Sequence, residues 1–198
     1  RRSMDIELEM HAHDDLGLAT ANTLAAIVAG ATHVNTTVHG LGERAGNAPL
    51  EEVVMALKHL HEIDTGIDLS DYACLSTLVA NASGRPVAWQ KSLVGQGAFT
   101  HEAGIHVDGL IKDRRNYQGV DPNELGRDHT LVLGKHSGTH AVQRAYAAMD
   151  LLLDRHQADC ILQQIRSFVT HSKRPPDSTD LLNFYHDLVD FAEGAVCL

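Results

Sequence analysis

The feature that most restricts the fold is an alternation of strand-like and helix-like segments within residues 5–62. Segment 5–10, "DIELEM", alternates apolar and acidic residues with a period of two, which indicates a strand. The alanine-rich segment 18–31 has apolar residues at helical spacing, which predicts a helix. The β-branched segment 33–38 predicts a second strand, and the segment 49–60 predicts a second helix. This order is typical of parallel strands joined by crossover helices.

Two such units leave long strand edges unpaired and do not make a stable sheet or barrel alone. The chain also begins with Arg1 rather than methionine, and the strand pattern starts within a few residues. We therefore expect the C-terminal part of a longer protein whose N-terminal half is missing from this chain.

From residue 68 onward the pattern changes to a mostly helical accessory region. Turn-rich or helix-breaking segments are expected at 116–127 and 173–177, and a short strand with a turn at 129–138. Helices are expected in the segments 69–84, 98–113 (after a loop), 142–149, 161–169 and 181–189.

Charge and cysteine usage limit the class of protein. The formal net charge of −10 argues against nucleic-acid binding, which needs basic clusters to neutralise phosphate. No apolar run approaches the roughly 20 residues that span a bilayer, and no signal peptide is recognisable. Cys74, Cys160 and Cys197 are odd in number and form no C-x-x-C pair, so we expect a reducing cytoplasm without disulfides.

The stretch "EMHAHDDLG" (9–17) is the first candidate site. His11 and His13 share strand parity and face one side, at the carboxyl end of the first strand, where parallel α/β proteins place active sites. Imidazole is a common metal ligand, so a metal site and a hydrogen-bonded core pair both remain open. Asp14 and Asp15 could accept hydrogen bonds from the histidine N–H groups or cap the following helix, and one of them is expected only to cap.

The loop "GLGERAGN" (40–47) follows the second strand and so lies at the same end. Its glycines let backbone approach a ligand closely, and Asn47 offers a neutral oxygen to a metal. Glu43 and Arg44 are either functional or a structural ion pair that shapes the loop. Further along, His106 lies between apolar residues and is a candidate general base, whereas Tyr117 alone indicates little.

Together these motifs resemble the metal-dependent 2-oxo-acid acyltransferases of the isopropylmalate and homocitrate synthase family, which are TIM barrels. Residues 11–57 are similar to the last two βα units of that barrel. "HEAGIHVDGL", "YQGVDP", "LGR" and "LVLGKHSG" resemble the family's accessory subdomains in order. The resemblance implies an α/β fold, with the end of a (β/α)8 barrel at 1–66, a helical linker subdomain at 67–128 and a C-terminal helical subdomain at 129–198.

Within the family, "HAHDDLGLATANT" and "NTTV" resemble the homocitrate synthases of nitrogen fixation. Isopropylmalate synthases normally carry a C-terminal regulatory domain, and too little chain follows Gly138 for one. Related lyases place a catalytic cysteine in the loop after the last strand, but residues 39–47 contain none. These departures favour condensation of acetyl-CoA with 2-oxoglutarate, with 2-isopropylmalate or citramalate synthesis and a non-catalytic barrel-completing subunit as the alternatives.

The resemblance also implies residue roles. His11, His13 and Asn47 would bind a divalent ion, Mn2+ or Mg2+, whose third protein ligand in the family is an aspartate on the first barrel strand. Gly42, Glu43 and Gly46 would form the acetyl-CoA end of the pocket. His106 with Tyr117 would assist proton transfer inside a partner subunit's barrel, which implies a homodimer with domain exchange.

Overall fold

The structure is a computed structural model that describes residues 6–196. These residues form two compact units, each described here by itself. Unit 1 contains the described residues up to Phe99 together with Pro122–Asp128, and unit 2 contains Thr100–Asp121 and the described residues from His129 onward. The three-part division at 66/67 and 128/129 stays a prediction.

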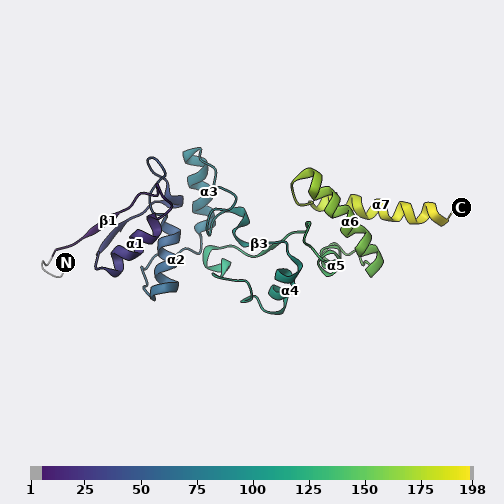
Figure 1. Cartoon of the computed structure of the whole chain (residues 1–198), viewed down its shortest axis with the longest axis horizontal. Coiled ribbons are helices and arrows are strands. Elements are labelled where there is room, and N and C mark those ends of the chain that lie inside the picture. The colour runs from purple at the N-terminus through teal and green to yellow at the C-terminus, as the bar shows by residue number, and fades with distance from the viewer. Residues whose placement is uncertain (1–5, 197–198) are drawn as a thin grey trace. The chain divides into compact units, whose positions relative to one another are not determined.

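Unit 1 begins with the expected strand–helix–strand–helix order (Figure 1). Strand β1 (Glu9–His11) pairs in parallel with β2 (His33–Asn35), so the predicted parallel arrangement is confirmed for this pair. The intervening helix α1 spans Ala19–Val28, and α2 spans Leu50–His61.

Both strands are shorter than the sequence pattern predicted. Residues 6–8 and 36–38 lie outside the parallel ladder, and Asp5 of the predicted strand lies outside the described residues. Each strand has only the other as a neighbour in this sheet, and a two-stranded sheet is marginal. Beyond the three paired positions, Thr37 forms only an isolated parallel bridge with Pro49.

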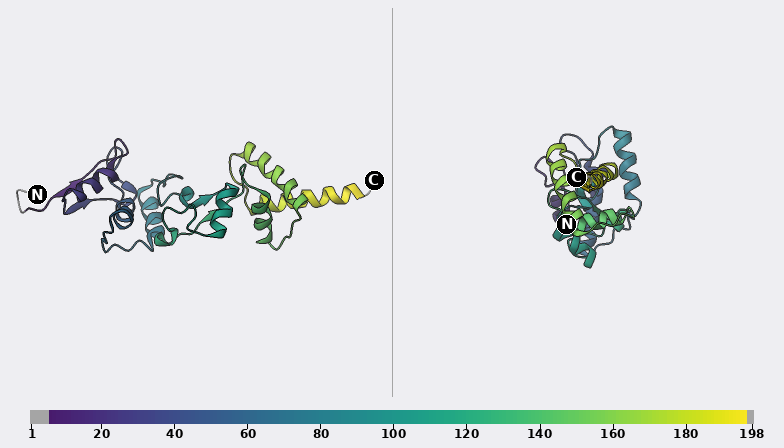
Figure 2. Two further views of the ribbon diagram at one scale, coloured as in Figure 1. Left: turned by 60° about the horizontal axis from the view of Figure 1, so that its bottom comes forward. Right: turned by 90° about the vertical axis from the view of Figure 1, so that its right-hand side faces the viewer.

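One face of the small sheet is covered and the other is open. Helices α1 and α2 pack on each other, and α1 also contacts both strands, as two viewing directions show (Figures 1 and 2). On the open face, Glu9 lies opposite His33 and His11 lies opposite Asn35, and all four residues are exposed. The covered face forms a core of Met10, Ala12, Ala19, Leu24, Ile27, Val34, Ala48, Val53 and Leu57.

The remainder of unit 1 is built from one helix and short 3-10 turns. These are η1 (Val38–Gly40), α3 (Tyr72–Ser83), η2 (Gln96–Phe99) and η3 (Pro122–Leu125). Arg127 joins the last segment to the unit, because its guanidinium donates to the carbonyls of Leu93 (2.7 Å) and Gly95 (2.9 Å) and lies over the Phe99 ring. Leu125 is fully buried.

Unit 2 combines a second short parallel pair with four helices. Strand β3 (Thr100–His101), which the sequence pattern did not predict, pairs with β4 (Thr130–Leu131). The helices are α4 (Gly104–Lys112), α5 (Thr139–Ala147), α6 (Arg155–Ser172) and α7 (Ser178–Val196). The expected helical segments are therefore confirmed as helices.

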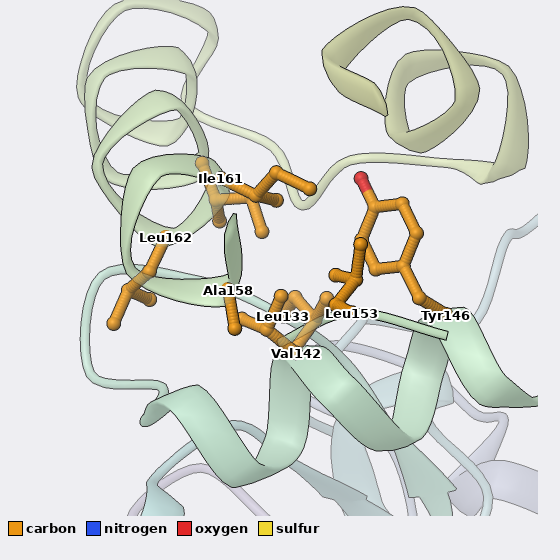
Figure 3. Packing of buried hydrophobic residues seen from close by; sticks show 8 residues of the cluster. Leu133, Val142, Tyr146, Leu153, Ala158, Ile161 and Leu162 are labelled. Atoms are coloured by element: carbon orange, nitrogen blue, oxygen red, sulfur yellow. The ribbon is translucent and has the colours of Figure 1, made fainter. Parts of the chain in front are cut away.

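The core of unit 2 lies where α5, α6 and α7 meet (Figure 3). Val142 and Tyr146 of α5 pack with Ile161 of α6, all with no exposed surface, and the Tyr146 hydroxyl donates to the carbonyl of Leu181 at 2.6 Å. Asp154 closes a capping box at the start of α6. Within residues 6–196, no helix is both long and apolar enough to cross a membrane.

Candidate active site

The two histidines of the first candidate site face each other. His11 ends β1, His13 follows two residues later, and their Nε2 atoms lie 3.1 Å apart. The ring centroids are 4.9 Å apart, with the planes inclined by 62°. The two side chains therefore point to the same place at the carboxyl end of β1, as their spacing of two residues predicted.

Asn47 is brought to the same place by the loop that follows β2. Its backbone forms an isolated antiparallel bridge with His13, and its side-chain Nδ2 donates to the carbonyl of Leu41 at 3.2 Å. Asn47 Oδ1 and His13 Nδ1 are buried and find no hydrogen-bond partner among the described residues. An unsatisfied buried acceptor costs about 1–3 kcal/mol, so the Asn47 oxygen suits a site completed by a ligand. His13 Nδ1 would carry the ring proton once Nε2 binds an ion.

The donor set fits a divalent ion. Two imidazole nitrogens bound about 2.1 Å from one ion at a right angle lie about 3.0 Å apart, close to the 3.1 Å between His11 and His13. The same distance also fits a hydrogen bond between two neutral rings, so the separation alone does not decide. Two nitrogens and the amide oxygen of Asn47 are ligands that several divalent ions accept.

No carboxylate completes this set within the described part of the chain. There, no three histidine, cysteine, aspartate or glutamate residues gather in a metal-binding arrangement. Asp14 instead caps α1, because its Oδ1 accepts the N–H of Ala19 at 2.8 Å, as expected for one of the two aspartates. The metal ligands His11, His13 and Asn47 stay predictions.

Asp15 pairs with Arg44, which lies in the glycine-rich loop. Arg44 donates from Nε and from an Nη atom to the two carboxylate oxygens of Asp15, at 3.0 and 3.2 Å. This pairing lowers the pKa of Asp15 and raises that of Arg44. The alternative of an ion pair between Glu43 and Arg44 is therefore wrong, because the Arg44 guanidinium reaches the preceding loop; the Glu43 side chain is exposed.

The glycines of the loop are required by its close folding. Gly46 has φ of 96°, and a Cβ there would lie 2.1 Å from the carbonyl oxygen of Gly40. A Cβ on Gly42 would lie 2.6 Å from Nδ2 of Asn47. The loop therefore closes on itself around Asn47, and bulkier residues at 42 or 46 would displace it.

A buried polar cluster behind the loop was missed by sequence reasoning. Glu51 has no exposed surface, and its Oε2 accepts the Tyr72 hydroxyl and the N–H of His39, the latter at 3.2 Å. The His39 ring bonds Ser76 Oγ at 2.7 Å, and His39 itself has φ of 61°. Burial lowers the pKa of His39, and burial with the Glu51 contact raises the pKa of Tyr72.

From the sequence, Glu51 had no role beyond its place in the predicted helix 49–60. A signal for its burial was present, because positions 54 and 55, one helical turn on, are Val54 and Met55, which are both buried. The apolar face of α2 is therefore wide enough to include position 51.

In unit 2, the structure brings His106 and Tyr117 together. Their ring centroids lie 4.3 Å apart with planes inclined by 33°, and Tyr117 has φ of 58°. The carboxylates near His106 in sequence are used elsewhere, since Glu102 accepts the N–H of His136 at 2.9 Å and Asp108 pairs with Lys112 at 2.6 Å. The general-base role of His106 stays a prediction.

A second histidine pair lies beside His106. His101 Nε2 is 3.1 Å from His129 Nδ1, and the other nitrogen of His129 lies 2.9 Å from Oε1 of Gln118. The rings of His101 and His106 are 6.5 Å apart. Burial, followed by the neighbouring histidines, lowers the pKa of His101. The contacts of His39, His101 and His129 join segments far apart in the sequence, so local spacing could not predict them.

Two family models match adjacent parts of the chain. Residues 2–79 match the HMGL-like family, and residues 93–173 match the homocitrate synthase post-HMGL domain-like family. The chain is 47% identical over 187 residues to 2-isopropylmalate synthase 2 of Caldanaerobacter subterraneus subsp. tengcongensis, covering 94% of this chain and 49% of the relative.

Two further relatives carry different names. Homocitrate synthase 1 of Nostoc sp. is 45% identical over 181 residues, covering 91% of this chain and 48% of the relative. A protein of Methanosarcina acetivorans that carries a citramalate synthase name is 44% identical over 188 residues, covering 95% of this chain and 39% of the relative. The chain thus spans about half the length of the first two.

The chain therefore belongs to the family in which an HMGL-like domain is followed by a homocitrate synthase post-HMGL domain-like region, and its relatives are named as 2-isopropylmalate, homocitrate and citramalate synthases. The family resemblance read from the motifs is confirmed at this level. The TIM-barrel family follows from the HMGL-like match, whereas the assignment of residues 1–66 to the last two barrel units stays a prediction.

Proposed function

We propose that the chain is part of a homocitrate synthase that condenses acetyl-CoA with 2-oxoglutarate to give homocitrate and CoA. The observation that carries the proposal is the convergence of His11 and His13, with Nε2 atoms 3.1 Å apart, together with the buried Oδ1 of Asn47, which has no hydrogen-bond partner among the described residues. Relatives named as homocitrate synthases support the reaction class and leave the acid open. A role in nitrogen fixation stays a prediction.

In this proposal His11, His13 and Asn47 hold a divalent ion, Mn2+ or Mg2+. Such an ion, when bound, would supply Lewis-acid polarisation of the 2-oxo group. The chain positions these donors through strand parity, through the bridge between His13 and Asn47, and through the glycines that fold the loop around Asn47. A further carboxylate ligand would come from barrel residues outside this chain.

The proton chemistry falls to His106 with Tyr117. His106 would accept a proton from the acetyl methyl group, and the resulting carbanion would attack the ketone carbon. The oxygen of that ketone then takes up a proton to become a hydroxyl, and water cleaves the thioester to a carboxylate and free CoA. The stacked Tyr117 ring limits rotation of the His106 ring and so favours one orientation for proton transfer. Gly42, Glu43 and Gly46 would line the acetyl-CoA end of the pocket.

Completing the site needs other polypeptide. We propose that the remaining barrel strands assemble with β1 and β2 on their open face and edges, and that His106 acts in the barrel of a partner subunit, in a homodimer with exchanged domains. The exposed histidines of that face, His11 and His33, would then line the barrel interior. On this view the isolated chain is inactive.

The test is release of free CoA from acetyl-CoA by the chain joined to, or mixed with, the N-terminal half of a homocitrate synthase relative. The proposal predicts turnover with 2-oxoglutarate and none by the chain alone. His13→Ala should abolish turnover, whereas His171→Ala, on the exposed side of α6, should not. Turnover by the chain alone, or unchanged activity in His13→Ala, would contradict it.

A second candidate is 2-isopropylmalate or citramalate synthesis. It is favoured by the 47% identity over 187 residues to a 2-isopropylmalate synthase. Two homocitrate synthases are 45% identical over 181 and 174 residues. The same assay separates the candidates, because 2-oxoisovalerate or pyruvate would then replace 2-oxoglutarate as the acid that drives CoA release. A non-catalytic, barrel-completing subunit is the third candidate, and it predicts no release with any acid.

A further inference from the structure

A pocket in unit 1 has a charge pattern opposite to that of the chain. It lies between the glycine-rich loop and the segment that follows α3, and its volume is about 240 Å3. Arg44, Arg85, Lys91 and His39 line it, and no aspartate or glutamate does. The whole chain has more acidic than basic residues, 26 against 16. The lining of this pocket has the opposite balance, with three permanently charged basic residues and no acidic residue.

Two of the three cations are already paired. Arg44 binds Asp15, and Lys91 binds Glu52 at 2.5 Å. Arg85 is exposed, and among residues 6–196 its guanidinium has no hydrogen bond or ion pair. Arg85 therefore keeps all its donors for a ligand in the pocket.

The backbone of the loop adds further donors. Within the part of the chain that the structure describes, the N–H groups of residues 42–45 donate no hydrogen bond. Their neighbours are all engaged, since the amides of Leu41, Gly46 and Asn47 donate to carbonyls of the same region. Arg44 has φ of 55°, the left-handed conformation that curls successive amides into an anion-binding concavity.

We propose that this pocket binds the phosphate groups of an organic diphosphate, with Arg85 and the amides of the lining residues Gly42, Arg44 and Ala45 as its donors. A guanidinium matches phosphate oxygens in pairs, and unpaired loop amides complete such a site without needing further cations. The coenzyme A part of the thioester is one source of this chemistry, and naming it rests on the proposed function. The phosphate site itself does not.

The first test is a titration of the 15N-labelled chain with sodium pyrophosphate in the presence of EDTA, followed by NMR. The amide resonances of Gly42, Arg44 and Ala45 should shift, and Arg85→Ala should weaken binding about tenfold or more, as expected for loss of a charge-assisted hydrogen bond. The matched control is Arg155→Ala, which removes an exposed arginine of unit 2 and should leave binding unchanged. Unshifted amides at these three loop positions, or equal affinity in Arg85→Ala, would overturn the proposal.

Coenzyme A then identifies the source. Displacement of pyrophosphate by coenzyme A supports a thioester ligand. Binding of pyrophosphate that coenzyme A does not displace supports the phosphate site and overturns only its link to coenzyme A. Because no 2-oxo acid or metal is present, failure here leaves the synthase assay intact, and a negative synthase assay leaves this binding result intact.

Discussion

The buried contact between Tyr72 and Glu51 gives the sharpest stability prediction. Glu51 has no exposed surface, and its Oε2 receives two donors, the Tyr72 hydroxyl and the N–H of His39. Tyr72→Phe removes one donor and leaves the acceptor buried. Hydrogen bonds to charged groups contribute about 1.5–3 kcal/mol, so we expect a loss of about 2–3 kcal/mol.

The assay is urea unfolding followed by fluorescence of Trp89, which is the single tryptophan and lies in unit 1. Its signal therefore reports the unit that contains the contact. A loss of about 2–3 kcal/mol corresponds to roughly a 30- to 150-fold change in the folding equilibrium. Amide hydrogen exchange of α5–α7 serves as the internal control for unit 2 and should match that of the unmutated chain.

A double-mutant cycle with Glu51→Gln isolates the pair. If the hydroxyl and carboxylate interact as the structure shows, the two substitutions couple by about 1 kcal/mol or more. The reasoning is refuted if Tyr72→Phe changes the unfolding free energy by less than about 0.5 kcal/mol, the range of unremarkable surface substitutions, or if the two losses simply add.

The remaining predictions use the same unfolding assays. Gly46→Ala should destabilise unit 1 far more than Gly30→Ala, because both positions have strongly positive φ but only Gly46 faces backbone at 2.1 Å; equal losses would refute the clash. His39 has a pKa held below 6.5 by burial, so its contribution is present above pH 6.5 and is lost as the pH falls through the folded pKa. His39→Gln should flatten this acid limb of the Trp89 curve, and an unchanged limb would contradict it. Ile161→Ala should cost about 2–5 kcal/mol in the helical transition of unit 2, and a cost below 1 kcal/mol would show that its cavity collapses.

The parts of the fold set by local pattern were predictable from the sequence. The parallel order of β1 and β2, the helices, and the facing of His11 and His13 all follow from periods of two and 3.6 residues. Strand lengths were overestimated, because the pattern marks where a strand is possible and pairing decides where it ends.

Contacts between distant segments were not predictable. Arg44 lies next to Glu43 in sequence, yet its partner is Asp15 in the preceding loop. His101 and His129 are 28 positions apart and meet only because β3 and β4 pair. No local period encodes such a meeting, since it depends on how the connecting chain closes.

The most direct test of the proposed metal site is a titration of the 15N-labelled chain with Mn2+, read as paramagnetic broadening of NMR signals. The structure offers two competing histidine pairs with the same 3.1 Å separation, His11 with His13 and His101 with His129. Broadening centred on His11, His13 and Asn47, and removed by His13→Ala, is the predicted result. Broadening centred on His101 and His129, or unaffected by His13→Ala, would contradict the site and the function proposed from it.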